Sequence, residues 1–355
     1  MVFLAEKHIA MKGTILGLAA ALLVFTGCGK TSPAVAEQND KPYGGIENSV
    51  ENGIDGHSLT INADPQIRHP YYDLVNKPKP PTGAPYVTSG RINTDKKVTF
   101  KYGRLDARIK IPNLYQGLWP AFWLMDAGGD VYSVYNEIDI LEIGTGWPGK
   151  NNQEKETNSL IESSLHYGPN VDTLTSTSNT TNIYGELHMD YRLYTMIWDE
   201  NTIKTYVDLD KNPQAGPHFE VTLDNIAQKF VNREHYIILN LAAGGAYTNI
   251  PGDRNTEDGT QINKITALNA ANNYEAKMYI DFVRIYNSTS NIADPDTLVW
   301  ADEFNTGTVP NKMYWNIENN AVYNYELEWY TKDSVTIEND NLVITVRRHD
   351  PSSEE

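Results

Sequence analysis

Residues 104–111 read Arg-Leu-Asp-Ala-Arg-Ile-Lys-Ile, a strict alternation of polar and apolar side chains. A period of two places neighbouring side chains on opposite faces, so this stretch predicts a half-buried β-strand. Residues 203–209 and 342–346 repeat the alternation, and residues 237–243 form a mostly apolar run suited to a central strand. One short helix is expected over residues 223–230, where apolar side chains recur at helical spacing. Many short strands separated by glycine and proline predict an all-β sandwich of the jelly-roll kind.

The composition is that of a folded protein. Of the 355 residues, 40% are hydrophobic and 10% aromatic, which supplies a packed core and leaves aromatic rings for a ligand. The formal net charge is −17, so a nucleic-acid backbone or an anionic membrane surface would be repelled. We therefore exclude nucleic acid as a partner and expect one large domain with appendages.

The first residues have the features of an export signal. Lys12 precedes an apolar run at residues 15–25, too short for a transmembrane helix but suited to a secretory signal. The run ends in Phe-Thr-Gly-Cys, which resembles the lipobox of bacterial lipoproteins, and Cys28 is the only cysteine. We predict a lipoprotein signal peptide at residues 1–28 and a flexible tether at residues 29–47. The protein would then be exported and lipid-anchored in a bacterial cell envelope, at the outer membrane or cell surface. A buried structural thiol is the alternative for the cysteine.

An acidic cluster stands at residues 136–143, which read Asn-Glu-Ile-Asp-Ile-Leu-Glu-Ile. In a strand, Glu137 and Asp139 share one face, whereas Glu142 is one residue out of phase. A β-bulge at residues 140–141 would return the third acid to the same face, and bulges are frequent beside active sites. Three carboxylates would then line one face of a single strand.

Paired carboxylates are the catalytic groups of glycosidases. Retaining enzymes need two carboxyls about 5 to 5.5 Å apart, one a nucleophile and the other an acid that later acts as base. A third carboxyl between Glu137 and Glu142 would raise at least one pKa, so that one group stays protonated while another is ionised. The alternative is an acidic strand that merely faces water.

The acidic run is also a family signature. Residues 137–142 match the bulged motif of glycoside hydrolase family 16, and residues 117–125, Gly-Leu-Trp-Pro-Ala-Phe-Trp-Leu-Met, look like the block that precedes it in laminarinases. Further blocks that fit the family are residues 88–92, 101–104, 165–169, 239–245 and 280–286. This resemblance implies an endo-acting, retaining β-glucanase on a concanavalin-like jelly roll with a concave substrate cleft. By position, Glu137 would be the nucleophile and Glu142 the acid/base, and Asp139 would hydrogen-bond Glu137 and tune it.

The order of the family segments is unusual. Segments like residues 299–305 and 325–331 normally open a member of this family, but here they come last. We therefore predict a single circularly permuted catalytic domain at residues 48–349, because termini of compact domains often lie close together. Its predicted parts are residues 86–286 (the family's C-terminal part), 287–297 (a linker), 298–349 (the family's N-terminal part) and a tail at 350–355. The alternative is a fusion with a truncated second domain.

The resemblance and the aromatic content suggest groups that bind sugar, because aromatic rings pack on the C–H faces of sugars. The candidate substrate-binding residues are Trp119, Trp123, Arg91, Trp147, His166, Asn240, Glu326 and Trp329. Core packing is the alternative for the tryptophans and the histidine.

Catalysis of this type requires no cofactor. The resemblance implies a structural calcium on the convex side, with Asp281, Glu303 and the backbone oxygen of Gly103 as ligands, since calcium accepts mixed oxygen ligands. Ordinary strand carboxylates are the alternative.

Three functions remain open. The first is a monomeric endo-1,3-β-glucanase that acts on laminarin-type β-glucan, with the membrane reached only through the lipid on Cys28. The second keeps the chemistry but changes the polymer to a mixed-linkage glucan or agar-type galactan, or transfers the sugar to another sugar instead of water. The third is a non-catalytic glycan-binding lipoprotein, against which the retention of all three acids counts.

Overall fold

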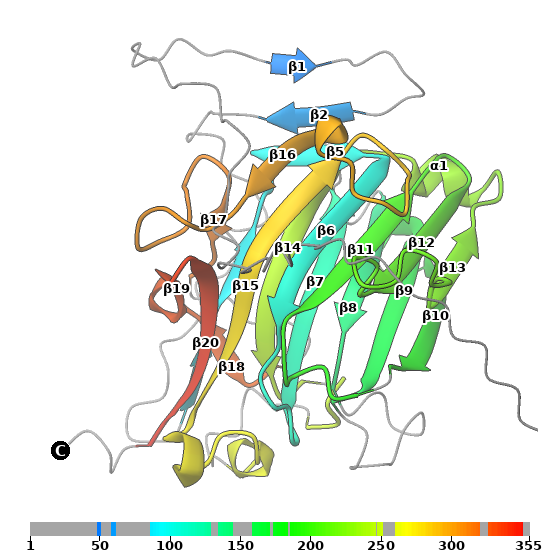
Figure 1. Ribbon diagram of the computed structural model, residues 1–355. Coiled ribbons are helices and arrows are strands. Elements are labelled where there is room, and N and C mark those ends of the chain that lie inside the picture. The colour runs from blue at the N-terminus through cyan, green and yellow to red at the C-terminus, as the bar shows by residue number, and fades with distance from the viewer. Residues whose placement is uncertain are drawn as a thin grey trace, which may run out of the picture. The chain divides into compact units, whose positions relative to one another are not determined.

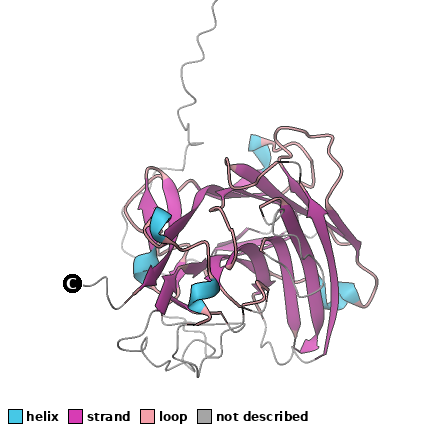
Figure 2. Ribbon diagram, turned by 90° about the horizontal axis from the view of Figure 1, so that it is seen from below, coloured by secondary structure: helices cyan, strands magenta, loops and turns pink. Residues whose placement is uncertain are grey.

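A computed structural model of the chain describes residues 48–50, 58–61, 86–128, 134–144, 158–170, 173–183, 185–245, 247–250, 260–319 and 326–350. These residues belong to one compact unit, Tyr43–Glu355, in which two sheets pack face to face (Figures 1 and 2). The predicted all-β sandwich is confirmed. The predicted signal peptide, the predicted tether and the residues after 350 lie outside the described residues.

The first sheet carries the acidic strand. Its order is β1-β2-β5-β14-β7-β8-β9-β10, with β4 also paired to β14 and β17 paired to β4. The strands are β1 (Asn48–Val50), β2 (Ser58–Ile61), β4 (Arg91–Asn93), β5 (Val98–Lys101), β7 (Leu118–Asp126), β8 (Tyr135–Glu142), β9 (Leu160–Asn170), β10 (Thr173–Asn182), β14 (His235–Ala243) and β17 (Asn316–Ile317).

The second sheet has the order β13-β12-β11-β6-β15-β20-β3-β18, with β16 paired to β15 and β19 to β20. The strands are β3 (Tyr86–Ser89), β6 (Gly103–Lys110), β11 (Arg192–Trp198), β12 (Thr202–Val207), β13 (Phe219–Thr222), β15 (Glu275–Tyr286), β16 (Leu298–Asp302), β18 (Glu328–Tyr330), β19 (Val335–Glu338) and β20 (Asn341–His349). All the pairings are antiparallel except that of β18 with β3.

Helical structure is sparse among the described residues. The predicted helix is confirmed but short, since α1 covers Ala227–Val231 and the preceding turn is held by Asp224, whose Oδ1 accepts from the amides of Ile226 and Ala227. Single 3₁₀ turns occur at Ile262–Lys264, Ala270–Asn272, Pro295–Thr297 and Lys332–Ser334.

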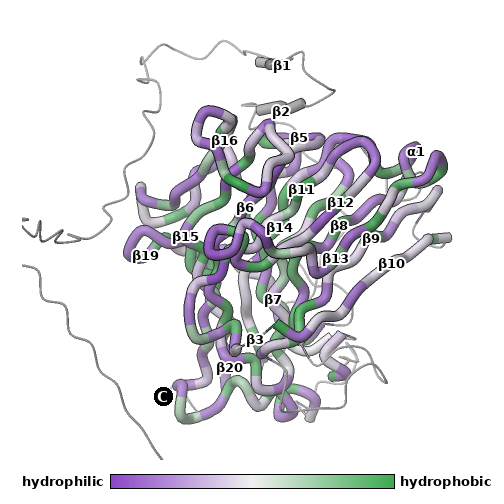
Figure 3. The backbone as a smooth tube through the Cα atoms, turned by 45° about the vertical axis from the view of Figure 1, so that its right-hand side comes forward, coloured by the Kyte–Doolittle hydropathy of each residue, from purple (hydrophilic) through white to green (hydrophobic). Residues whose placement is uncertain are grey.

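The core lies between the two sheets and follows the predicted alternation. In β6, Leu105, Ala107 and Ile109 are fully buried and belong to the same hydrophobic cluster as Ile138 of β8 and Leu239 of β14. Figure 3 shows hydrophobic and hydrophilic positions alternating along the strands. The period of two therefore determines which side chains enter the core.

Two polar side chains of β6 are buried, although the alternation predicted that this side of the strand would face water. Arg104 and Asp106 are 1% and 2% exposed, and they form an ion pair at 2.8 Å. Thr195 donates to Asp106 at 2.7 Å, and the Arg104 guanidinium donates to the carbonyl of Asn291 at 2.6 Å. Because these partners replace water, the pair can be buried, although burial raises the pKa of Asp106.

Proline at position 120 lies within β7, a central strand. Pro120 is opposite Leu241 of β14, whose amide donates to the carbonyl of Gly90 on the other side. The backbone groups of Leu241 therefore point away from β7, so the missing N–H of proline costs no hydrogen bond to β14.

The C-terminal segment supplies strands to both sheets. β16 and β20 pair with β15, β17 pairs with β4, and β18 and β20 lie on either side of β3. The segment at residues 298–349 is therefore part of the sandwich. The circular permutation itself remains a prediction, because strand pairing does not record the ancestral order of the segments.

Removal of residues 288–355 should prevent cooperative folding. Without them, β3 loses both of its neighbours in the second sheet, and buried side chains such as Trp315 and Ile344 are lost from the core. We expect no thermal transition by circular dichroism or calorimetry. Truncation after residue 350 is the control and should melt as the full chain does. A cooperatively melting 1–287 fragment would instead favour a fusion of two domains.

Candidate active site

The bulge in β8 is confirmed and places three acids on one face. Trp123 of β7 is opposite Asp139 and Phe122 is opposite Leu141, so Ile140 is the extra residue. Ile140 and Leu141 are both fully buried in the core, and the phase of the strand changes between them. Glu142 thereby returns to the outer face of the first sheet that also carries Glu137 and Asp139. We call this surface the acid face.

Asp139 is the buried centre of the acid face. The hydroxyl of Ser164 donates to Asp139 Oδ2, and Nε2 of His166 lies 3.4 Å from the same oxygen. The histidine is itself placed by Ser176 on β10, whose Oγ lies 2.8 Å from Nδ1. Both partners of the carboxylate come from β9, the strand beside β8, and β10 holds the histidine in place.

Glu137 has a different partner from the one the family resemblance predicts. Its Oε2 accepts from the hydroxyl of Tyr135 at 2.6 Å, two residues earlier on β8, and it makes no hydrogen bond to Asp139 in the structure. A carboxylate has no proton to donate to another carboxylate, so the coupling of the two acids is electrostatic. Burial and the charge of Asp139 raise the pKa of Glu137 to about 7, against the lowering effect of His166, Tyr135 and Arg91.

Glu142 lies among other carboxyl groups on the acid face. Burial and the charges of Asp139, Glu137 and Glu162 raise its pKa well above the usual value, although Nε1 of Trp119 donates to Oε1 at 3.1 Å. Among the described residues, no cation opposes these charges as His166 and Arg91 do at Glu137, so burial and charge favour the protonated form of Glu142. The coupled acids titrate as a set.

His166 provides positive charge beside these acids. Burial alone would lower its pKa, but the hydrogen-bonding interaction with Asp139 and the negative charges around it raise that pKa to about 9. The imidazolium is thus the stable form at neutral pH, and it stabilises the ionised form of Glu137. His166 is half-buried and lies on the acid face outside the core, and its predicted role in sugar binding stays a prediction.

Two tryptophans of β7 flank the acids on the same face. Trp119 is stacked on Tyr247 with ring centroids 4.8 Å apart, and the Tyr247 hydroxyl donates to Glu162 at 3.4 Å. Trp123 donates from Nε1 to Asn240 Oδ1 at 2.8 Å. Both rings remain partly exposed, so each leaves a surface on which a sugar can pack.

Arg91 connects this aromatic surface to the C-terminal segment. Its guanidinium lies 4.8 Å from the ring centroid of Trp123, and its Nε donates to Glu318 at 2.9 Å. Asn240 in turn donates to the hydroxyl of Tyr330 at 3.2 Å. The structure therefore brings Arg91, Trp123 and Asn240 together, with Arg91 and Asn240 only 6% and 4% exposed. Their predicted role in sugar binding stays a prediction.

Two further predicted sugar-binding residues, Glu326 and Trp329, lie in the C-terminal segment. Glu326 is buried, and its burial beside the carboxyl of Glu328 raises its pKa well above the usual value. Trp329 lies on the opposite side of β18 from Tyr330, the neighbour that reaches Asn240, and the structure gives it no contact with the acid face. The roles of Glu326 and Trp329 in sugar binding stay predictions. Trp147 and Cys28 lie outside the described residues.

The family model for glycosyl hydrolases family 16 matches residues 43–260 of this sequence. The chain belongs to glycoside hydrolase family 16. The match includes the acids of β8 and the tryptophans of β7.

Family relatives differ in length and in described activity. A "Glucan endo-1,3-beta-glucosidase A1" from Niallia circulans is 28% identical over 226 residues, which are 60% of this chain and 28% of that protein. A "Beta-1,3-glucan-binding protein" from Penaeus monodon is 30% identical over 185 residues, which are 45% of this chain and 47% of that protein. The chain thus spans about a quarter to a half of the length of these relatives. A solved Bacteroides ovatus mixed linkage glucan family 16 structure in complex with a product is 29% identical, with a TM-score of 0.45, covering 59% of this chain and 83% of that one.

The calcium ligands expected from the family do not fit well in this member. Asp281 pairs with Arg108 at 2.9 Å, and Glu303 accepts two hydrogen bonds from Arg284 at 2.8 and 3.0 Å. Both carboxylates therefore have arginine partners in the structure, as ordinary strand carboxylates often do. Calcium binding, with Gly103 as a third ligand, stays a prediction. Among the described residues, the acidic and histidine ligands dense enough to hold a metal ion are those of the acid face itself, namely Glu137, Asp139 and His166.

The sequence analysis missed several residues of this family 16 site. Glu162 and Ser164 share the face of His166 on β9, so the period of two could have found them once the histidine was placed. Tyr135 could have been found in the same way from Glu137. Tyr247 lies beyond the end of β14, and no sequence pattern indicated its stacking on Trp119.

Replacement of the histidine beside the acids should shift the pH profile of the enzyme. His166→Gln removes a positive charge that lowers the pKa of Glu137, so that pKa should rise above about 7. We expect the acidic limb of kcat/KM to move to higher pH, measured between pH 4 and 9 on a short soluble oligosaccharide, because this limb reports ionisation of the free enzyme. His349→Gln, on the second sheet, is the control. An unchanged acidic limb would contradict the proposed coupling.

Proposed function

We propose that this protein is an endo-acting, retaining β-glucanase that hydrolyses internal β-1,3-glucosidic bonds of laminarin-type glucans. The observation that carries the proposal is the placement of two glutamates, Glu137 and Glu142, on the acid face that also presents Trp119 and Trp123. His166 and Arg91 lower the pKa of Glu137, whereas the charges of three neighbouring carboxylates raise the pKa of Glu142. A retaining glycosidase requires two carboxyls in such different environments, one a nucleophile and the other a proton donor.

In the first chemical step, a carboxylate oxygen of Glu137 attacks the anomeric carbon of the sugar. The bond from this carbon to the glycosidic oxygen breaks, and that oxygen takes the proton of Glu142. In the second step, Glu142 accepts a proton from water as the water oxygen attacks the same carbon. This attack releases Glu137 as a carboxylate, so two inversions give overall retention.

The neighbouring residues tune these two steps. Asp139 holds a negative charge between the two glutamates and so raises the pKa of both. His166 limits this effect at Glu137, and with a pKa of about 7 a substantial fraction of the nucleophile is ionised at neutral pH. Trp119 donates to Glu142 and lies on Tyr247, and its exposed surface is available to a sugar ring.

A glycan-binding role without catalysis is the second candidate. It is favoured by the similarity to the Penaeus monodon protein, whose name describes β-1,3-glucan binding. Mixed-linkage glucan and agar-type galactan remain alternative polymers for the enzyme, and transfer to another sugar remains an alternative to hydrolysis. One experiment separates these possibilities.

Product release should be measured on laminarin, mixed-linkage glucan, cellulose and agarose with the wild type and with Glu137→Gln. We expect short oligosaccharides from laminarin, and a decrease of about 10³-fold or more in the variant, because its amide cannot act as the nucleophile. The variant should still bind the polymer. Glu220→Gln, an exposed glutamate paired with Lys204, is the control. Cleavage of another polymer would change the substrate, and binding without any cleavage would support the non-catalytic role.

We also propose that the protein is a monomer anchored in the cell envelope by a lipid on Cys28. The support is the position of this cysteine at the end of the apolar run. Within the described residues, no helix has the length and apolar character needed to span a bilayer.

The full-length protein should partition into the detergent phase of a phase-separating detergent, and Cys28→Ala should move it to the aqueous phase. The lipid supplies the hydrophobic surface, so its loss removes the affinity for detergent. Aqueous partitioning of the wild type would overturn the lipidation.

A further inference from the structure

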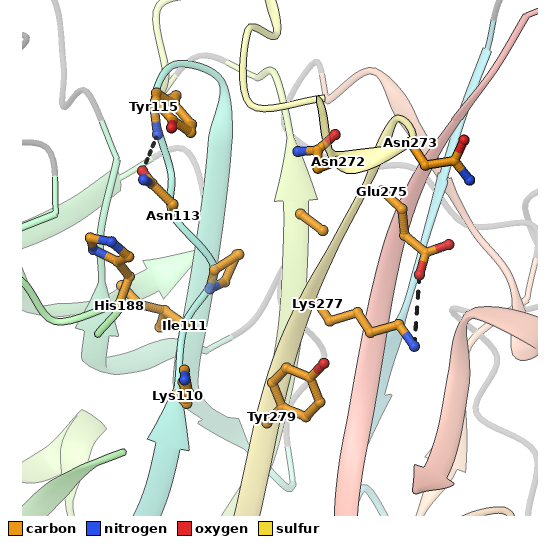
Figure 4. A pocket seen from close by; sticks show the side chains of 12 residues that line it. Lys110, Ile111, Asn113, Tyr115, His188, Asn272, Asn273, Glu275, Lys277 and Tyr279 are labelled. Atoms are coloured by element: carbon orange, nitrogen blue, oxygen red, sulfur yellow. Dashed lines mark hydrogen bonds and ion pairs between the residues drawn. The ribbon is translucent and has the colours of Figure 1, made fainter. Parts of the chain in front are cut away.

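A hollow of about 520 Å³ opens on the second sheet, between the end of β6 and the beginning of β15. Figure 4 shows side chains from both strands and from two loops gathered around it. Its lining includes Lys110, Asn113, Tyr115, Asn273, Lys277 and Tyr279. Nothing in the proposed reaction uses this place.

The hollow is separate from the acid face. Ile109 and Ile280 are opposite one another in the pairing of β6 with β15, and both are fully buried in the core. Their neighbours Lys110 and Tyr279 are also paired and therefore point to the other side of the sheet. The hollow thus lies on the outer face of the second sheet, and the core separates it from the acids.

The loop that forms one wall is firmly held. Gly117 has φ +99° and approaches the backbone so closely that a Cβ there would be 3.0 Å from the Cα of Ile265. Asn158 holds the same loop, because its Oδ1 accepts from the amide of Leu114 and its Nδ2 donates to Asn113, both at 2.9 Å. A wall fixed in this way loses little conformational entropy when a ligand binds.

Strained residues stand at the rim of the hollow. Tyr115 has φ 39°, and its side chain leaves the residue 57% exposed. On the facing loop, Asn273 has φ 54° as the C-cap of the 3₁₀ turn Ala270–Asn272, a conformation that asparagine adopts readily, and Tyr274 has φ 57°. Positive φ is uncommon for bulky residues such as tyrosine. Tyr115 thus presents an aromatic ring to solvent at the rim of the hollow.

The hollow also offers hydrogen-bond donors that no other described group of the protein uses. In the described part of the chain, Lys110 and the Tyr279 hydroxyl have no hydrogen-bond or ion-pair partner. Glu275 is the acid of the lining, and its charge is balanced by Lys277 and Arg347. An exposed aromatic ring beside free donors is the chemistry that recognises a sugar, whose C–H face packs on the ring and whose hydroxyls pair with the donors.

We propose that this hollow is a second carbohydrate-binding site, which holds a segment of neutral glucan chain outside the acid face. Tyr115 is the platform for one sugar ring, and Lys110 and Tyr279 bind hydroxyl groups. A neutral polymer is favoured over an anionic one, because a single unpaired lysine does not offset the formal net charge of −17. The choice of glucan rests on the proposed function.

The consequence of such a site is a tethered substrate. A polymer held on the second sheet stays near the acid face, so its next encounter there is effectively intramolecular. Short oligosaccharides fill only the acid face and gain nothing from the tether. Polymer and oligosaccharide kinetics should therefore respond differently to changes in the hollow.

The test uses the full chain with Glu137→Gln, which removes turnover, in affinity electrophoresis through gels that contain laminarin, mixed-linkage glucan or agarose. Tyr115→Ala in this background should weaken polymer binding about fivefold, whereas Tyr115→Phe keeps the ring and should bind as the parent does. Ile226→Ala, at another exposed position, is the control. In the active enzyme, Tyr115→Ala should raise KM for the polymer about fivefold and leave kcat/KM for a tetrasaccharide unchanged.

Every other outcome either contradicts the second carbohydrate-binding site or changes the polymer that this site binds. Equal retardation of Tyr115→Ala and its parent in every gel would overturn the proposal, as would an equal loss on the tetrasaccharide. No retardation of the parent in any gel would also overturn it. If the wild type cleaves no glucan, the proposed function fails, but retardation by agarose that depends on Tyr115 would keep the second site with a different polymer.

Discussion

One extra residue in β8 is the constraint on which the acid face depends. An unbroken period of two would point Glu142 into the core, away from Glu137 and Asp139. The bulge at Ile140 lets Ile140 and Leu141 both enter the core and reverses the phase for the residue that follows. The hydrogen bond from Trp119 to Glu142 and the charge coupling of the three acids both follow from this reversal.

Burial raises the pKa of both Glu137 and Glu142, but the charges around the two side chains differ. Glu162 adds a fourth carboxyl to the face, whereas His166 and Arg91 lower the pKa of Glu137. These cations act at the Glu137 end, so the ionised form is stabilised there and opposed at Glu142. Unequal placement of positive charge thus gives two identical side chains different environments, as the proposed roles of nucleophile and acid require.

Strand pattern and local motif could be predicted from the sequence, because both depend on residues close together along the chain. The alternation at residues 104–111 identified the core side chains of β6, and the spacing of the acids identified the bulge. The burial of the polar side chains of β6 could not be predicted, because Arg104 donates to the carbonyl of Asn291, a residue far away along the chain. The stacking of Tyr247 on Trp119 was missed for the same reason, as it joins a turn after β14 to a strand far earlier in the chain.

The ion pair of Arg91 with Glu318 connects residues 227 positions apart. Contacts of such long range form slowly, since much of the chain must be ordered before they can close. During synthesis, the residues of β4, β7 and β8 therefore emerge long before the partner that completes their support. A nascent chain that already carries all three acids of β8 still lacks the contacts of the acid face with residues 298–349, so this face is finished only after that segment has been synthesised.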